Sequence, residues 1–492
     1  MKLSSIAAAV LLSSVVASSA QASQVAAELH GYVRSGTLWT ANGMRNANRI
    51  GLRAGSEGYF RLGNEEDTKL ELLPTIKWTA DDGVWAKMRA NLTHQTRDTS
   101  DWCAEAFDSK DGRGGIQVRE TFIEMGGFEF NPSTVFWAGK RYSQMEISSH
   151  QYTYDYLQNN GTGGGFENMD IGFAKWDLGV YDYTIMGEGW NSNWSFENSK
   201  QGSPNELSVN TWLHAIGGTG LDIQLKYVDL DTFRPDYAYG ETARYRESNQ
   251  ATSGLLVSVL YNTPGFFWFG NGYGKICFQY AKGADSGKRT GQNGYGWGNN
   301  KDQETTRLIV EGLWDITKNF STSVFAMYQY DHALDEWNSA VPKSDFDDRF
   351  EGQYNKNANF YAIGVRPYHQ ITNHFAMQYE LGYEHENHSG SGWGDGLKSA
   401  SVFKATIAPT LTLDMGYWGR PQIRAFVTYA KWSKGAEQLT ELDGKNTGSG
   451  VGGEGHDYKQ GSMVLGGVDG FGQYKARYTD AWMVGFQGEA WF

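Results

Sequence analysis

The stretch FAMQYELGYE, residues 375–384, alternates at every step between a large apolar residue and a small or polar one. Successive residues of an extended chain point to opposite faces. One face therefore carries Phe375, Met377, Tyr379, Leu381 and Tyr383, and the other carries Ala376, Gln378, Glu380, Gly382 and Glu384. This period of two predicts a β-strand between an apolar and a polar environment. A soluble β-sandwich alternates too, but the many large aromatic side chains on the apolar face favour a barrel that meets lipid.

Short turns join some of the strand-like runs, and long polar segments join the others. A tight turn at 371–374 links the first stretch to the alternating run 361–368, and similar turns are expected at 315–319 and 80–83. Long segments rich in Gly, Asn, Asp and Ser separate other runs, at 98–115, 282–305, 335–359, 385–398 and 435–474. Short turns at one end and long loops at the other predict an all-β fold, a transmembrane antiparallel β-barrel. No linker divides the chain after its first residues, so we expect one domain over residues 23–492.

The composition excludes several classes of protein. A chain with 14% aromatic residues is not expected to be disordered. A formal net charge of −13, with no cluster of Lys and Arg, argues against nucleic acid as a partner. Beyond residue 22 no run of about 18 apolar residues occurs, so membrane-spanning helices are not expected. The two cysteines, Cys103 and Cys277, are too few for a disulfide framework, and we expect no bridge between them.

Both ends of the chain carry features of an exported membrane protein. Lys2, the apolar stretch 6–16 and the small residues Ala20 and Ala22 predict a secretory signal peptide over residues 1–22. A buried N-terminal helix is the alternative interpretation. At the other end, an alternating run closes on Phe492, and a terminal aromatic residue of this kind is typical of the assembly signal of outer-membrane barrels. We therefore expect a multi-pass protein of the Gram-negative outer membrane, with outer-membrane lipid around it.

No pattern typical of an enzyme is present. The ten histidines form no His-Glu-x-x-His pair, and no Gly-x-Ser-x-Gly elbow occurs. We therefore expect no catalytic residue, no cofactor and no metal site. A barrel enzyme, such as an outer-membrane lipase or protease, stays an alternative, because a nucleophile and its base can be distant in sequence.

Several short motifs, spread in order over the whole mature chain, resemble those of the maltoporin family. They are HGYVRSG at 30–36, FRLGNE at 60–65, WAGKR at 137–141, FENMDIGF at 166–173, IGVRP at 363–367 and RPQIR at 420–424. The resemblance implies a barrel of 18 strands, a homotrimer, and a loop between Arg141 and Phe166 that folds inward and constricts the pore. It also implies facilitated diffusion of sugars, of the maltose and maltodextrin type or related oligosaccharides, along a row of aromatic rings.

The resemblance further implies which residues bind the sugar. The aromatic positions of the family match Tyr32, Trp102, Tyr154, Trp418 and Trp491. Trp102 would reach into the pore of the neighbouring subunit, Tyr156 is an alternative to Tyr154, and a last position matches Tyr295 or Trp297 poorly. The charged positions match Arg34, Arg61, Glu71 and Arg119.

Strand parity supports two of the rings without the resemblance. Trp418 shares a face with Arg420, Gln422 and Arg424. Trp491 shares a face with Gln487 and Glu489. Both tryptophans are therefore expected to point into the water-filled lumen.

The sequence also departs from the family. Met145, Ile147 and Tyr152 stand where the family has charged residues, and Lys69 stands where it has a tyrosine. Uncharged side chains make weaker hydrogen bonds to sugar hydroxyls, so we expect weaker maltodextrin binding than in typical members. A general diffusion porin, or a porin for a different sugar class, stays open as an alternative.

Overall fold

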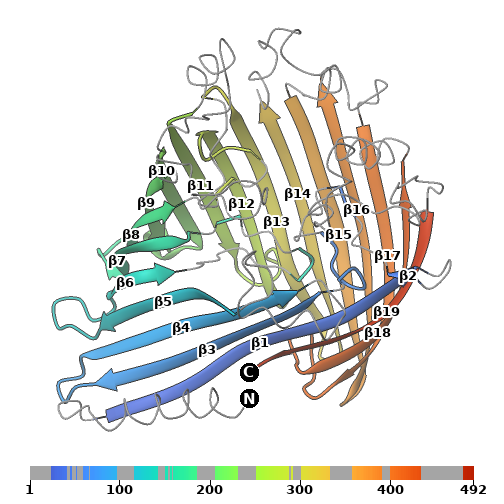
Figure 1. Cartoon of the computed structure of the whole chain (residues 1–492), viewed down its shortest axis with the longest axis horizontal. Coiled ribbons are helices and arrows are strands. Elements are labelled where there is room, and N and C mark those ends of the chain that lie inside the picture. Colours follow the sequence, from blue (N-terminus) through green and yellow to red (C-terminus); the bar gives the residue numbers. More distant parts are fainter. Residues whose placement is uncertain are drawn as a thin grey trace, which may run out of the picture.

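The computed structural model describes residues 24–40, 45–46, 51–52, 59–65, 67–96, 116–141, 150–152, 156–157, 159–184, 205–230, 251–287, 290–291, 301–332, 357–389, 399–433 and 480–492. These residues form a closed antiparallel β-barrel (Figure 1). The predicted signal peptide lies outside them, as do Trp102, Cys103, Met145, Ile147, Tyr154, Tyr295 and Trp297. Within the described ranges, no helix is both long and apolar enough to cross a membrane.

Eighteen long strands build the wall of the barrel. They are β1 (Gln24–Thr40), β3 (Thr68–Thr79), β4 (Trp85–Thr96), β5 (Gln117–Gly126), β6 (Val135–Arg141), β7 (Gly161–Asp170), β8 (Lys175–Thr184), β9 (Asn205–His214), β10 (Leu221–Leu230), β11 (Ser253–Thr263), β12 (Gly272–Gly283), β13 (Glu304–Thr317), β14 (Phe320–His332), β15 (Asn357–Thr372), β16 (Phe375–Ser389), β17 (Ser399–Thr412), β18 (Gln422–Trp432) and β19 (Asp480–Trp491). A two-residue strand, β2 (Arg45–Asn46), pairs with the end of β1, and a single 3-10 turn, η3 (Ile216–Gly218), lies between β9 and β10.

The first strand closes the barrel by pairing on both of its edges. Tyr32 is the register partner of Glu71 on β3 and of Trp491 on β19. Where β19 ends, Gly31 N–H donates to the Phe492 carbonyl over 2.9 Å, and Phe492 N–H donates back to the Gly31 carbonyl over 3.1 Å. Every long strand therefore has two antiparallel neighbours, and the predicted 18-stranded barrel is confirmed.

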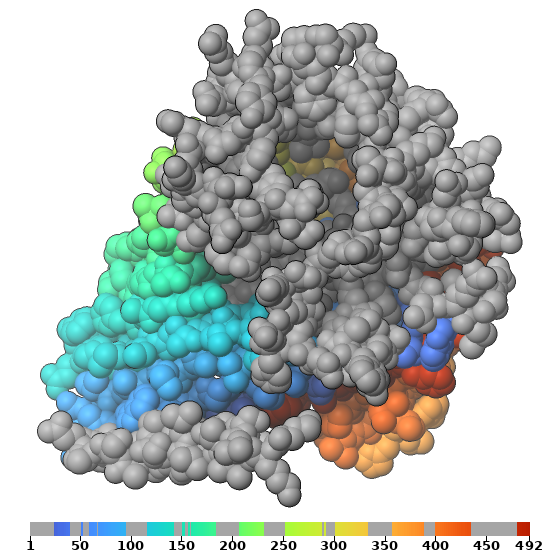
Figure 2. Space-filling model, in the orientation of Figure 1, coloured from blue at the N-terminus to red at the C-terminus, as the bar shows by residue number. Residues whose placement is uncertain are grey.

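The strands bury polar side chains and expose large apolar ones, the reverse of the distribution in a soluble protein. On β16, Gln378, Glu380 and Glu384 are buried, whereas Leu381 and Tyr383 are 48% and 39% exposed. The alternation predicted for residues 375–384 is therefore confirmed, with its polar face inside the barrel. Figure 2 shows part of the outer surface, where β3–β8 (blue to turquoise) form one flank. A lumen with polar walls and an apolar outer surface are the features of a barrel set in lipid.

The connections follow the predicted asymmetry between the two ends. Tight turns at 80–84, 318–319 and 373–374 join β3 to β4, β13 to β14 and β15 to β16. Strand β13 ends at Thr317, three residues into the turn expected at 315–319, and β15 ends at Thr372, two residues into the turn expected at 371–374. Strand β3 ends at Thr79, before its expected turn. Long connections join β4 to β5, β14 to β15 and β18 to β19 at the opposite end.

A segment between β2 and β3, residues 59–65, lies inside the barrel and packs against its inner wall. Its carbonyls accept hydrogen bonds from Lys404, Thr406 and Thr428, and the Leu62 N–H donates to Glu380 over 2.9 Å. These four partners lie on β16, β17 and β18, so the segment lines that part of the inner wall.

The described part of the predicted constriction loop also lies inside the barrel. Gln151 Nε2 donates to Ser323 Oγ on β14 over 2.9 Å, and Gln279 Nε2 on β12 donates to the Tyr156 carbonyl over 3.0 Å. The loop leaves β6 and returns to β7, so it crosses the barrel to reach β12–β14. The predicted inward folding is confirmed for these residues.

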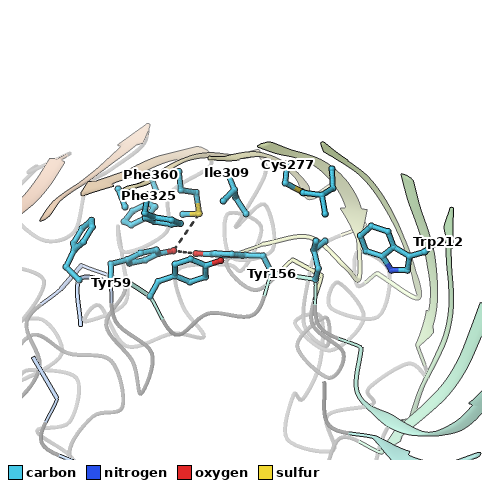
Figure 3. Packing of buried hydrophobic residues seen from close by; sticks show 13 residues of the cluster. Tyr59, Tyr156, Trp212, Cys277, Ile309, Phe325 and Phe360 are labelled. Atoms are coloured by element: carbon cyan, nitrogen blue, oxygen red, sulfur yellow. Dashed lines mark hydrogen bonds between the residues drawn. The ribbon is translucent and has the colours of Figure 1, made fainter. Parts of the chain in front are cut away.

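The two inward segments meet in one aromatic cluster (Figure 3). The ring of Tyr59 lies 5.8 Å from Phe325 and 5.3 Å from Phe360, and the Tyr59 and Tyr156 hydroxyls are hydrogen-bonded. Tyr152 completes the cluster, with its ring 4.5 Å from Phe325. The cluster therefore fixes both segments to the wall formed by β12–β15.

The seat of Phe60 on β16 gives a testable expectation. A Cβ atom added at Gly382 would lie 2.1 Å from the Phe60 ring, so Gly382→Ala should displace Phe60 at a cost of about 1–3 kcal/mol. The open-channel conductance in planar bilayers should fall, because residues 59–65 lie inside the barrel and can leave its wall only toward the lumen. Gly488→Ala is the control, because nothing lies within 4 Å of its added Cβ. An unchanged conductance in Gly382→Ala would contradict the role of this seat.

Candidate binding site in the barrel lumen

Three of the predicted aromatic residues lie toward the short-turn end of the lumen. Tyr32 and Trp491 are register partners on β1 and β19. Trp418 lies in the turn between β17 and β18, with its ring 42% exposed. Trp491 shares its side of β19 with the buried Gln487 and Glu489, as strand parity predicted.

The parity argument for Trp418 was wrong, because this residue is not part of a strand. Strand β18 begins only at Gln422. The turn before it contains Gly416 at a φ of 96°, a backbone conformation that favours glycine and interrupts the extended chain. The structure still places Trp418 close to the lumen-facing residues, but through its contact with the constriction loop.

His150 of the constriction loop connects the tryptophans, and sequence reasoning did not include it among the site residues. Its ring centroid lies 4.5 Å from that of Trp418 and 5.5 Å from those of Trp491 and Tyr417. Burial and the neighbouring Arg420 guanidinium hold the pKa of His150 well below its usual value, so the imidazole is neutral at pH 7. Arg420 Nη2 accordingly donates to Nδ1 over 3.5 Å. A single histidine in a polar loop gives no sequence signal for this position.

Glu489 is the centre of the charged part of the site. It accepts hydrogen bonds from the Tyr32 hydroxyl over 2.9 Å, from Arg420 Nε over 3.0 Å, and from Arg424. The Arg420 guanidinium also lies 4.0 Å from the centroid of the Trp491 ring. One face of this ring is therefore covered by a cation, which holds the ring in place.

The predicted residues Arg34 and Arg61 join a second part of the same network. Arg34 forms ion pairs with Asp67 over 2.7 Å and with Glu65 over 3.0 Å, and Arg61 pairs with Glu65 over 2.6 Å. Gln487 Nε2 donates to Glu65 over 3.0 Å and so links the segment 59–65 to β19. The network is buried and paired, as charges in a protein interior require.

Glu71 and Arg119 lie on the neighbouring strands. Lys69 Nζ is 2.8 Å from Glu71 Oε1 and 5.9 Å from the centroid of the Tyr32 ring, and Arg119 Nη1 is 3.9 Å from Glu71. Arg119 sits at a bulge, where two residues of β5 oppose one step of β4. The structure therefore brings all four predicted charged residues to the wall formed by β1, β3, β5 and the segment 59–65.

Two tyrosines of the constriction loop have a packing role. Tyr152, which stands at a charged position of the family, is 3% exposed, and its hydroxyl lies 3.5 Å from Glu311. Tyr156 is 1% exposed beneath the Arg307 guanidinium, 4.3 Å from its ring centroid. Neither ring is open to a ligand. Trp102 and Tyr154 lie outside the described residues.

The chemistry of the site is that of binding. Within the part of the chain that the structure describes, no group of three or more His, Cys, Asp or Glu side chains is arranged to hold a metal ion. Aromatic rings offer apolar faces for stacking, and the charged groups beside them offer strong hydrogen bonds. Together with the barrel, this lumen defines a diffusion channel of the Gram-negative outer membrane.

The comparison with known families agrees with this class. The family described as LamB porin matches residues 27–492. The chain therefore belongs to the LamB porin family, in accord with the resemblance to the maltoporins.

The chain is also similar to solved barrels from Pseudomonas aeruginosa. With OprD it shares 9% identity over 95% of each chain, at a TM-score of 0.41. With OccK1 (OpdK) it shares 8% identity over 96% of this chain and 99% of the other, at a TM-score of 0.46. With OccK2 (OpdF), solved in complex with glucuronate, it shares 9% identity over 95% and 98%, at a TM-score of 0.45.

The buried position of Glu489 predicts a large effect on stability. Glu489→Gln removes the charge shared by Arg420 and Arg424, and breaking a buried ion pair of this kind costs about 3–5 kcal/mol. The free energy of unfolding, measured by urea titration of the barrel in lipid bilayers, should fall by that amount. Glu28→Gln should change it little, because the pair that Glu28 forms with His30 has both side chains more than half exposed. Equal effects of the two substitutions would show that the Glu489 network does not stabilise the barrel.

Proposed function

We propose that the channel is selective for sugars of the maltose and maltodextrin type, or for related oligosaccharides, which cross by facilitated diffusion. The observation that carries this proposal is the partly exposed Trp418 ring beside His150 and Trp491. A pyranose has an apolar face that stacks on such rings, and hydroxyls that need hydrogen-bond partners.

The polar groups next to the rings suit those hydroxyls. The Tyr32 hydroxyl, Glu489 and Arg420 form one connected set beside Trp491. Their hydrogen bonds to one another keep them in place before a sugar arrives, which lowers the entropy cost of binding. A few such contacts in series allow both capture and release, as conduction requires.

The alternatives are a general diffusion porin and a porin for a different sugar class. Lys69, in place of a family tyrosine, lies 5.9 Å from the Tyr32 ring and adds a cation beside the proposed path. The loop residues Met145 and Ile147 are uncharged. These differences support weaker maltodextrin binding than in typical members of the family.

Removal of the open ring tests the proposal. Trp418→Ala should weaken the block of ion current by maltotriose by about 1–3 kcal/mol, a range taken from aromatic stacking on nucleobases. Ion conductance should persist, because the wall of the barrel is unchanged. Trp482→Ala is the matched control, since this ring is 53% exposed on the outer face of β19. Maltotriose block that is absent from the native channel would favour the general porin, and a panel of other sugars would then identify a different selectivity.

We also propose that the protein is a homotrimer, as the resemblance to the maltoporins implies. In that assembly Trp102 would reach the pore of a neighbouring subunit. A native mass measurement in mild detergent should give three copies, and the trimer should resist dilution. A monomer under these conditions would reject both the assembly and the shared role of Trp102.

A further inference from the structure

The inner faces of β3, β4 and β5 carry a stripe of charged side chains that starts beside Tyr32 and continues away from the aromatic site. Its members are Lys69, Glu71, Lys77, Lys87, Arg89, Arg119, Glu120 and Glu124. On β3 and β4 they share one face of the strand, and on β5 Arg119 lies at the bulge beside Glu120. The stripe runs along β3 from Lys69, on the loop side, to Lys77 near the turn 80–84. The eight steps from Lys69 to Lys77 span about 26 Å of strand, which is about 20 Å along the membrane normal at a strand tilt of about 35–45°. The stripe therefore extends over more than half of the hydrocarbon thickness of about 30 Å.

In each ion pair of the stripe, the cation is the more exposed partner. Arg89 is 36% exposed and its partner Glu120, at 2.9 Å, is 3% exposed. Lys87 is 31% exposed and Glu124, at 2.5 Å, is 8% exposed. The same order holds where Lys69 and Arg119 share Glu71. The surface that the stripe presents to the lumen is therefore cationic, although each pair is close to neutral.

Three cations of the opposite wall are buried instead. Lys226, Arg366 and Lys404 lie on β10, β15 and β17, and their side chains are 0%, 4% and 3% exposed. The segment 59–65 covers Lys404, because Lys404 Nζ donates to the Tyr59 carbonyl. Solutes in the lumen consequently meet the cations of β3–β5 more than these three, and Lys275 of β12 is a partly exposed lysine on that side.

Exposure decides which charge a passing ion experiences. At physiological salt the screening length is about 8 Å, so a charge at the lumen surface acts more strongly than one deeper in the wall. The low-dielectric wall further concentrates the field of the exposed groups into the lumen. At the end of the stripe near the turn 80–84, Lys77 and Lys87 both lie over the Trp85 ring, with their ammonium groups 5.3 and 6.0 Å from its centroid. The ring therefore holds two cations side by side.

We propose that the cationic stripe of β3–β5 is an anion track, and that the channel passes small anions in preference to cations. The formal net charge of the chain, −13, would by itself favour cations. The charge of the lumen surface, and not the net charge of the whole chain, would therefore set the ion preference. It depends on the channel alone and does not depend on sugar selectivity.

Reversal potentials in a potassium chloride gradient test the track with the full-length protein in planar bilayers. The native channel should be more permeable to chloride than to potassium. Arg89→Gln should lower the chloride-to-potassium permeability ratio by about twofold, because one exposed cation no longer concentrates anions. Lys175→Gln is the control: Lys175 lies at the start of β8, and its partner Asp170 is the more exposed member of that pair. The control should leave the ratio unchanged.

A paired substitution separates exposure from net charge. Arg89→Gln combined with Glu120→Gln leaves the net charge of the chain unchanged and leaves no unpaired buried carboxylate. The ratio should still fall as in the single variant, because only the exposed partner acts on the lumen. A ratio that returns to the native value in the double variant would overturn the proposal, and so would a native channel that prefers potassium. The double variant has no carboxylate at position 120, so it should keep native-like heat stability in detergent. That stability would show that a change in ratio does not reflect misfolding.

Discussion

A backbone amide inside a bilayer has no water to bond, so every strand that crosses the membrane needs a neighbour on both edges. The chain meets this constraint by pairing β1 with β3 and β19 at once, ending at the reciprocal hydrogen bonds of Gly31 and Phe492. Closure also frees the side chains, because the wall needs none of them to complete its hydrogen bonds. Apolar residues can then face lipid and polar residues can face the lumen, and the binding site is built from what the lumen face carries.

The strands could be predicted because their signal is local. The strand at residues 375–384 can be recognised from its period of two alone, because one face meets lipid and the other meets the lumen. Each tight turn can likewise be recognised from a few consecutive residues. The inward segments could not be predicted in the same way. Phe60 packs against Gly364 and Gly382 on distant strands, and Leu62 bonds Glu380. Nothing near residue 60 indicates which part of the wall it will meet, because that contact depends on closure of the whole barrel.

The candidate site was predicted unevenly for a related reason. Tyr32 and Trp491 lie on strands, so parity and register bring them together, and Arg34 follows two residues after Tyr32 on the same face. Trp418 lies in a turn, where parity has no meaning, and His150 lies in a loop. Tyr152 shows a further limit: a substitution that removes a charged position from the family pattern here adds a ring to a buried cluster. The change therefore concerns how the loop is held at least as much as what the loop can bind.

The inward segments also decide where the lumen is open. They cover the inner faces of β12–β18, and their buried ion pairs are a poor source of net stability, because desolvation offsets most of the attraction. What these pairs supply is a defined position, since a displaced segment would leave Glu380 or Glu384 with fewer partners. Among the described residues, the wall of β3–β5 keeps its lumen-facing cations partly exposed, and Trp491 lies nearby on β19. Because Arg420 occupies one face of the Trp491 ring, a sugar of the proposed kind could stack on the other face only. In the proposed path, a few shallow contacts in series would let a solute leave as readily as it enters.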